Sequence, residues 1–256
     1  MPEWIAIHMP QSRTFVAGSV RFWWDTWHDL AQVGGGSDQG LINEQEYKAR
    51  WEIMMGASPE MAVRWLTALG ADAVIVSGKQ SQEMYHDFTL PEKFSNALPV
   101  LYDDAQGNVI YQVPRRYWSL ARVVDRAQFT ALRPLEQSNL DLLRAYTAAI
   151  EQGPDAPTTT AWRGTANLSV HAHIGDGQAL LVQVTYDPSW HAYAAGRPLA
   201  IHKDPSTDFI LIEAQPGADD ITLAFETPLE NRIGWSLTLL SLLLSGALMV
   251  SAARRP

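Results

Sequence analysis

The spacing of apolar and polar residues changes near residue 155 of the chain. In the first part, Asn43 and Glu46 form a capping-box pair, which predicts the start of a helix that runs to about Met55. Ser58 predicts the N-cap of a second helix. This helix is expected to end at Gly70, because glycine readily adopts the left-handed conformation that closes a helix.

Short apolar runs in the same part of the chain predict β-strands. Residues 73–77 (Ala-Val-Ile-Val-Ser) have the composition of a buried strand and follow directly after the two helices. The turn-like residues 103–108 separate two apolar runs, so a hairpin is predicted there. The other predicted elements are strands at residues 13–20 and 120–124 and a helix over residues 135–150. Together these elements predict a mixed α/β domain over residues 1–153.

In the second part, apolar and polar residues alternate with the period of two that is typical of half-buried strands. Leu168, Val170 and Ala172 share one face of such a strand, and His171 and His173 lie on the opposite face. Turn residues separate several short strands of this kind. An antiparallel β-sandwich is therefore predicted over residues 158–230.

The C-terminal part of the chain contains an uncharged run over residues 233–253. As a helix this run would be about 31 Å long, which matches the hydrocarbon core of a bilayer. A transmembrane helix is therefore predicted here. Arg254 and Arg255 follow it, and the positive-inside rule then places the C-terminus in the cytoplasm and residues 1–232 outside it. The predicted fold class is α+β, with a mixed α/β domain, an antiparallel β-sandwich and one C-terminal transmembrane helix.

The N-terminal residues lack the basic and apolar regions of a signal peptide. A domain that lies outside the cytoplasm but has no export signal indicates the C-terminal part of a longer membrane protein. A split or internally started reading frame would give the same pattern.

Composition narrows the classes of function. The formal net charge is −9, and such an acidic chain is a poor binder of nucleic acid, because phosphate contacts need clustered lysine and arginine. The chain has no cysteine, which excludes a disulfide scaffold, a thiolate zinc site and a cysteine nucleophile. The absence of cysteine also suits an oxidising compartment. No cofactor is expected.

Aromatic residues and glycines are concentrated between residues 22 and 40. The glycine-rich stretch is not a phosphate loop, because no lysine follows it and Gln39 stands where a dinucleotide fingerprint needs glycine. Tryptophan rings in a loop must pack on protein, lipid headgroups or a ligand; they can stack on sugar rings while carboxylates bond hydroxyl groups. An ordinary flexible loop is the alternative. The predicted ligand-binding residues are Trp23, Trp24, Asp25, Asp38 and Gln39.

Other candidate sites are weaker. His171 and His173 could form a metal pair, but no third ligand has a recognisable spacing, so exposed histidines and no metal site are expected. Residues 186–193 are interpreted as a packed corner in which Trp190 fills the core. Serine and histidine residues form no catalytic motif, and no catalytic residue is predicted.

Several segments resemble a family of large bacterial integral membrane proteins. They include Arg13-Thr-Phe-Val-Ala-Gly-Ser-Val-Arg-Phe-Trp, the glycine-rich segment 32–40, Gly70-Ala-Asp-Ala-Val-Ile-Val-Ser, residues 85–94, residues 109–116 and residues 186–193. The family is labelled 6-pyruvoyl-tetrahydropterin synthase-related and is similar to the YfhO-like and glycosyltransferase-C groups. Ser189 departs from the glycine usual in the family, which relaxes that corner.

This resemblance implies a location in the bacterial cytoplasmic (inner) membrane and many membrane helices ahead of this region. Glycosyltransferase-C enzymes carry their catalytic carboxylate in an early extracytoplasmic loop, so this chain would be an accessory region without the catalytic part. The partners implied are the lipid bilayer, the upstream polytopic segment and a glycan or lipid-linked sugar. The alternatives are a membrane-tethered glycan-binding module and a structural or assembly domain. No pterin chemistry is expected, because no matching zinc-histidine motif is present.

Overall fold

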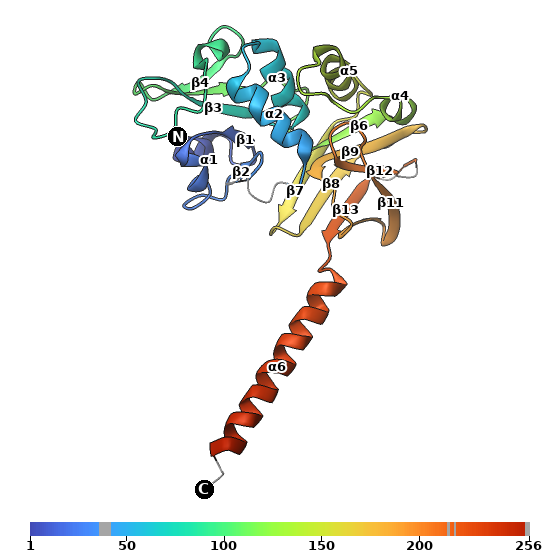
Figure 1. Ribbon diagram of the computed structural model, residues 1–256. Helices are drawn as coiled ribbons and strands as arrows, with labels where there is room; N and C mark the ends of the chain where they lie inside the picture. Colours follow the sequence, from blue (N-terminus) through green and yellow to red (C-terminus); the bar gives the residue numbers. More distant parts are fainter. Residues whose placement is uncertain (36–41, 214–215, 218, 254–256) are drawn as a thin grey trace.

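The computed structural model describes residues 1–256 except 36–41, 214–215, 218 and 254–256. It also describes the side chains of these residues, apart from those of 247, 248 and 250–253. Two β-sheets form one body, and the C-terminal helix leaves this body as an isolated rod (Figure 1).

The first sheet has the strand order β2-β1-β3-β5-β4. Its strands are β1 (Arg13–Val16), β2 (Ala31–Gln32), β3 (Ala73–Ser77), β4 (Val100–Asp103) and β5 (Asn108–Gln112). β1 pairs in parallel with β2 and with β3, whereas β3–β5 and β5–β4 are antiparallel. The predicted strand at residues 73–77 and the predicted hairpin are therefore confirmed.

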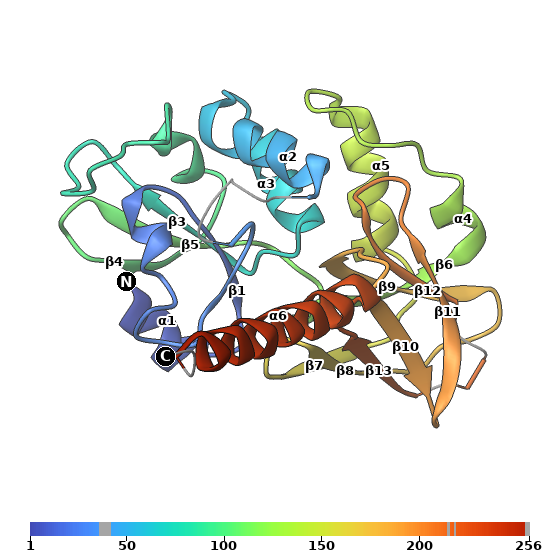
Figure 2. The same ribbon diagram turned by 60° about the horizontal axis from the view of Figure 1, so that its bottom comes forward.

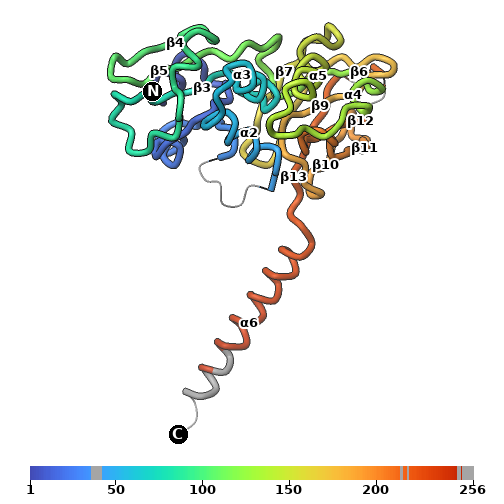
Figure 3. Tube along the Cα trace, turned by 45° about the horizontal axis from the view of Figure 1, so that its top comes forward, coloured from blue at the N-terminus to red at the C-terminus, as the bar shows by residue number. Residues whose placement is uncertain are grey.

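Two helices cover one face of this sheet. They are α2 (Glu44–Met55) and α3 (Pro59–Ala68), and Figure 3 shows them on the side of the body that comes forward there. The predicted caps are confirmed: the Asn43 side chain accepts hydrogen bonds from the N–H groups of Gln45 and Glu46, and the Ser58 side chain accepts one from Met61 N–H. Trp65 packs from α3 into a core cluster that includes residues of β1 and β3.

The opposite face of the first sheet packs against α1 (Pro2–His8) and the loop that follows β1. Ile5, Trp24 and Ile75 are members of one buried cluster there. Because both faces are covered, every residue of β3 is buried, which explains its continuous apolar run. Two short 3₁₀ helices, η1 (Ser19–Phe22) and η2 (Pro91–Phe94), complete this part of the molecule.

The second sheet has the strand order β6-β9-β12-β11-β10-β13-β8-β7. Its strands are β6 (Ala121–Asp125), β7 (Thr158–Arg163), β8 (Asn167–Ala172), β9 (Gln178–Thr185), β10 (Trp190–Ala194), β11 (Arg197–Lys203), β12 (Phe209–Glu213) and β13 (Asp220–Phe225). All its strand pairs are antiparallel.

The sheet is curled so far that its edge strands β6 and β7 meet, where Thr158 Oγ1 donates a hydrogen bond of 2.7 Å to Ala121 O. Side chains on its concave face form one apolar cluster, to which Val182, Ile212 and Leu223 belong. The predicted β-sandwich is therefore wrong: one curled sheet encloses this core instead of two stacked sheets. Alternation alone cannot separate the two arrangements, because both bury every second residue.

The outer face of the second sheet carries α4 (Arg126–Thr130) and α5 (Leu140–Glu151). The helix predicted over residues 135–150 begins only at Leu140, because the Asn139 side chain caps it by accepting a hydrogen bond from Leu142 N–H. Leu143 and Tyr146 of α5 share the large core cluster with α3. β6 lies ahead of the expected boundary near residue 153, so the second sheet begins within the first predicted domain.

The last helix, α6 (Leu229–Ala253), contacts none of this core in its described part. The predicted transmembrane helix over residues 233–253 is overturned, since none of the helices in the described part of the chain is both long and apolar enough to cross a membrane. The first turn of α6 carries the charged residues Glu230 and Arg232.

Candidate functional site

Residues 19–30, in the connection between β1 and β2, present aromatic side chains to solvent, and we call this segment the aromatic loop. Phe22, Trp23 and Trp27 are exposed, with 60 % of Trp23 and 75 % of Trp27 accessible. Trp24 is fully buried. Large exposed aromatic groups of this kind mark surfaces that bind a partner.

The buried ring of Trp24 holds the aromatic loop to the body. It packs in the cluster that also contains Ile5 of α1, Val16 of β1 and Ile110 of β5. Trp23 and Asp25 on either side of this buried ring are exposed.

Two carboxylates hold the start of the loop. Gly18 N–H donates to Asp87 Oδ2 at 2.8 Å. Ser19 N–H donates to Glu83 Oε1 at 2.7 Å, and Val20 N–H donates to Glu83 Oε2 at 3.2 Å. Consecutive N–H groups that point in one direction form an anion-binding concavity, which here is filled by acidic side chains of the same chain.

Gly18 is required at this position. Its φ is +85°, which lies in the region that favours glycine, and an added Cβ would lie 2.7 Å from Glu83 Cδ. Burial raises the pKa of Glu83, but the hydrogen bonds from Ser19, Tyr85 and Val20 together lower that pKa below its ordinary value. Glu83 is therefore ionised at neutral pH and keeps these bonds.

The structure distributes the predicted ligand-binding residues over different environments. Trp23 and Asp25 are exposed on the aromatic loop, while Trp24 lies in the core. Asp38 and Gln39 lie outside the described residues. Ligand binding by this set stays a prediction.

Glu83 and Asp87 received no role from the sequence. Asp87 lies in the segment that carries the family resemblance at Tyr85-His-Asp-Phe and Glu83 just ahead of it, but nothing in the sequence pairs these residues with residues 18–20. The two segments meet because β1 and β3 are adjacent parallel strands whose carboxyl ends lie at the same edge of the sheet.

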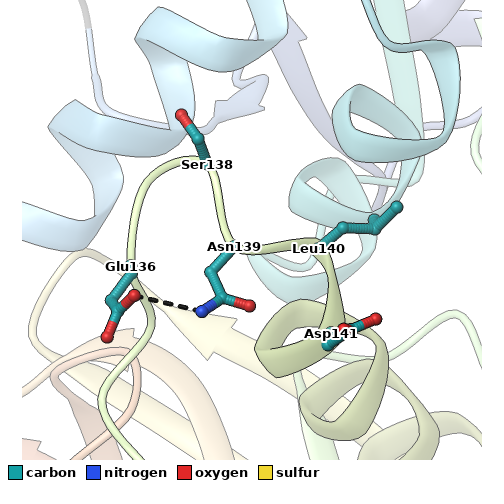
Figure 4. Close-up of a pocket in the computed structure, with 5 residues that line it drawn as sticks. All are labelled: Glu136, Ser138, Asn139, Leu140 and Asp141. Carbon is teal, nitrogen blue, oxygen red and sulfur yellow. Dashed lines mark hydrogen bonds between the residues drawn. The ribbon is translucent and has the colours of Figure 1, made fainter.

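A pocket of about 480 Å³ lies at the start of α5 and is drawn in Figure 4. Asn139 donates from its side-chain amide to Glu136 Oε2 at 3.0 Å and also caps α5. The side chains of Ser138, Leu140 and Asp141 point in different directions in Figure 4 and converge on no common point. We interpret this pocket as part of the helix cap and not as a binding site.

The histidines of the second sheet pair with carboxylates. His171 Nδ1 lies 2.9 Å from Asp220 Oδ1, and His173 Nδ1 lies 2.8 Å from Asp219 Oδ1. Both histidines are exposed. Within the described ranges, no group of three or more potential metal ligands comes together.

Comparison with known proteins gives no relative: no family model, no curated protein and no solved structure matches the chain. Its class is thus defined by its own fold and site, as an α+β protein of two sheets with an exposed aromatic loop and a projecting apolar helix.

Proposed function

We propose that this chain is the non-catalytic accessory region of a glycosyltransferase-C-like bacterial membrane protein, lying outside the cytoplasm. α6 supplies the contact between this region and the polytopic part of that protein. The family resemblance of the sequence and the character of α6 support the proposal.

The exposure of α6 carries the proposal. Leu240, Leu242 and Leu243 are all exposed, and their positions along a helix place them on different sides of the rod. Trp235 near its beginning is also 69 % exposed. A helix that is apolar on all sides must be covered by other apolar groups, because water solvates it poorly.

An apolar surface on the polytopic partner offers the cover that α6 needs. A soluble glycan does not, because its hydroxyl groups need polar partners. The position of α6 outside the body therefore favours the accessory region over an isolated glycan-binding module.

Co-purification tests the proposal. The full chain is co-expressed with the multi-helix membrane polypeptide encoded upstream of it, and the complex is isolated in detergent. We expect the two to co-purify, and we expect the double variant Leu240→Arg/Leu243→Arg to lose this association, because a charge buried without a partner against an apolar surface is strongly unfavourable.

The matched control is Ala127→Arg/Gln128→Arg, which places the same two charges on exposed positions of α4. It should leave co-purification unchanged. The proposal fails when no such polypeptide is encoded upstream, or when both double variants co-purify as well as the wild type.

A further inference from the structure

We propose that the aromatic loop, residues 19–30, contacts the headgroup region of a lipid bilayer. This inference rests on the proposed function, because it adds a lipid surface as a second contact of the same accessory region. The rings concerned are Phe22, Trp23 and Trp27.

The position of the loop supports a common surface with α6. The segment that contains α1, β1 and β2 lies at the lower left of the body in Figure 1, and α6 departs from the same lower side, below β13. Figure 2 turns this side forward and shows α1, β1 and α6 on it together. An apolar surface reached by α6 would therefore face the aromatic loop as well.

The loop is ordered before it meets a partner. Glu83 and Asp87 bind the N–H groups of residues 18–20, and Trp24 anchors the middle of the loop in the core. A surface that is already ordered loses little conformational entropy on binding. The outward rings are thus a stable feature of the fold.

The chemistry of the rings fits headgroups. Tryptophan has an apolar body and a polar N–H, and it prefers the boundary between lipid and water. The loop contains Arg21, Asp25 and Asp29, so its own charge gives no attraction to anionic lipid. Binding should therefore depend on ring insertion and change little with salt.

A sugar ligand is the less favoured occupant. Sugar recognition needs polar side chains fixed around the rings. The carboxylates that the fold fixes beside the loop, Glu83 and Asp87, already accept hydrogen bonds from its backbone. Four surface pockets of about 350–500 Å³ in the described part of the chain are lined by no residue of the aromatic loop.

A single label tests the inference, because the chain has no cysteine of its own. Thr26→Cys places an environment-sensitive fluorophore between Trp23 and Trp27, and Ala131→Cys places it at the end of α4 as a control. The full chain is mixed with phosphatidylcholine vesicles, with and without lipids that carry a quencher near the headgroup. We expect a blue shift and quenching at residue 26 and neither at residue 131.

Variants separate the rings from the rest of the surface. Trp23→Ala/Trp27→Ala should reduce the signal at residue 26 to that at residue 131, whereas Trp118→Ala, which removes another exposed tryptophan, should not. High salt and added anionic lipid should leave the wild-type signal unchanged.

Three results would overturn the inference: no response to vesicles at residue 26, an equal response at residue 131, or a response to soluble oligosaccharides without lipid, which would assign the loop to sugars. The label reports on the loop alone. A failed co-purification with an intact response at residue 26 would therefore reject the proposed function and leave the lipid contact standing.

Discussion

Burial strongly changes the pKa of one charged group, the side chain of Lys93. Its side chain is buried at the end of α2, where Nζ donates to Gly56 O at 2.6 Å and lies 3.4 Å from Glu52 O. Burial lowers the pKa of Lys93 to about 8, although the charge of Glu52 opposes this shift. Free lysine side chains titrate near 10.5.

This pKa predicts a pH dependence of stability. The folded state loses the Lys93 proton near pH 8, whereas the unfolded state keeps it to about pH 10.5, so unfolding takes up a proton between these values. The cost of burying the charge is present below pH 8 and is relieved as the pH rises through this window. We expect the stability of the wild type to rise relative to Lys93→Met between pH 8 and 10.5, as measured by urea denaturation. A difference that is independent of pH would contradict the lowered pKa.

For the two neighbouring tryptophans of the aromatic loop, the sequence did not predict which ring is buried and which is exposed. Their residue types predicted a binding role for both, but Trp24 is in the core and Trp23 is in solvent. Local sequence does not distinguish them. Which of the two rings is buried depends on which one reaches the cluster formed by α1 and β5, and these elements are distant in the sequence.

Among the elements, α3 ends in a turn that only glycine fits well. Gly70 has a φ of +76°, and an added Cβ would lie 2.8 Å from Oε1 of the buried Gln183. The turn therefore combines a left-handed backbone with close contact to the second sheet.

A comparison of Gly70→Ala with Gly177→Ala separates the backbone cost from the cost of the contact with Gln183. Gly177 has a similar φ of +71° with open space around it, so Gly177→Ala carries only the backbone cost of roughly 1–2 kcal/mol. We expect Gly70→Ala to cost about 1–3 kcal/mol more, because Gln183 must move. Thermal and urea unfolding of both variants would show this. Equal losses would mean that the contact with Gln183 does not matter.

Elements with local signals were predicted well. The caps at Asn43 and Ser58, the buried strand β3 and the hairpin β4–β5 match their predictions, because caps, turns and short apolar runs act through neighbours in the sequence. Predictions of how elements associate were weaker. The curled sheet was mistaken for a sandwich, and the helix α6 for a membrane span.

At the scale of the whole molecule, a buried polar network joins the two sheets. Arg115 Nη1 donates to Asp72 Oδ1 at 2.9 Å and to Gly70 O, and its Nη2 donates to Gln183 Oε1 at 2.7 Å and to Ser119 O. Burial lowers the pKa of Arg115, and the negative charge of Asp72 opposes that shift. Asp72 precedes β3 and Gln183 lies in β9, so one side chain connects both sheets.

Loss of this link should destabilise the whole body. Arg115→Met removes the donor to Asp72 Oδ1 and Gln183 Oε1, and breaking a buried pair in this way costs about 3–5 kcal/mol. Arg144→Met, which removes an exposed partner of Glu60, should have a much smaller effect. Urea denaturation with probes in each sheet measures both. Similar losses for the two variants would show that the network does not hold the sheets together.

The sequence by itself determined the local elements, the acidic and cysteine-free character of the chain and the concentration of aromatic residues after β1. Only the tertiary structure decided that β6 joins the second sheet, that Glu83 and Asp87 hold the aromatic loop, and that Trp23 and Trp27 remain exposed while Trp24 is buried. The physical reason is the range of the interactions. Caps and turns depend on residues a few positions apart, whereas the contacts that place the aromatic loop join residues far apart in the sequence, such as Ser19 and Glu83, which are 64 positions apart.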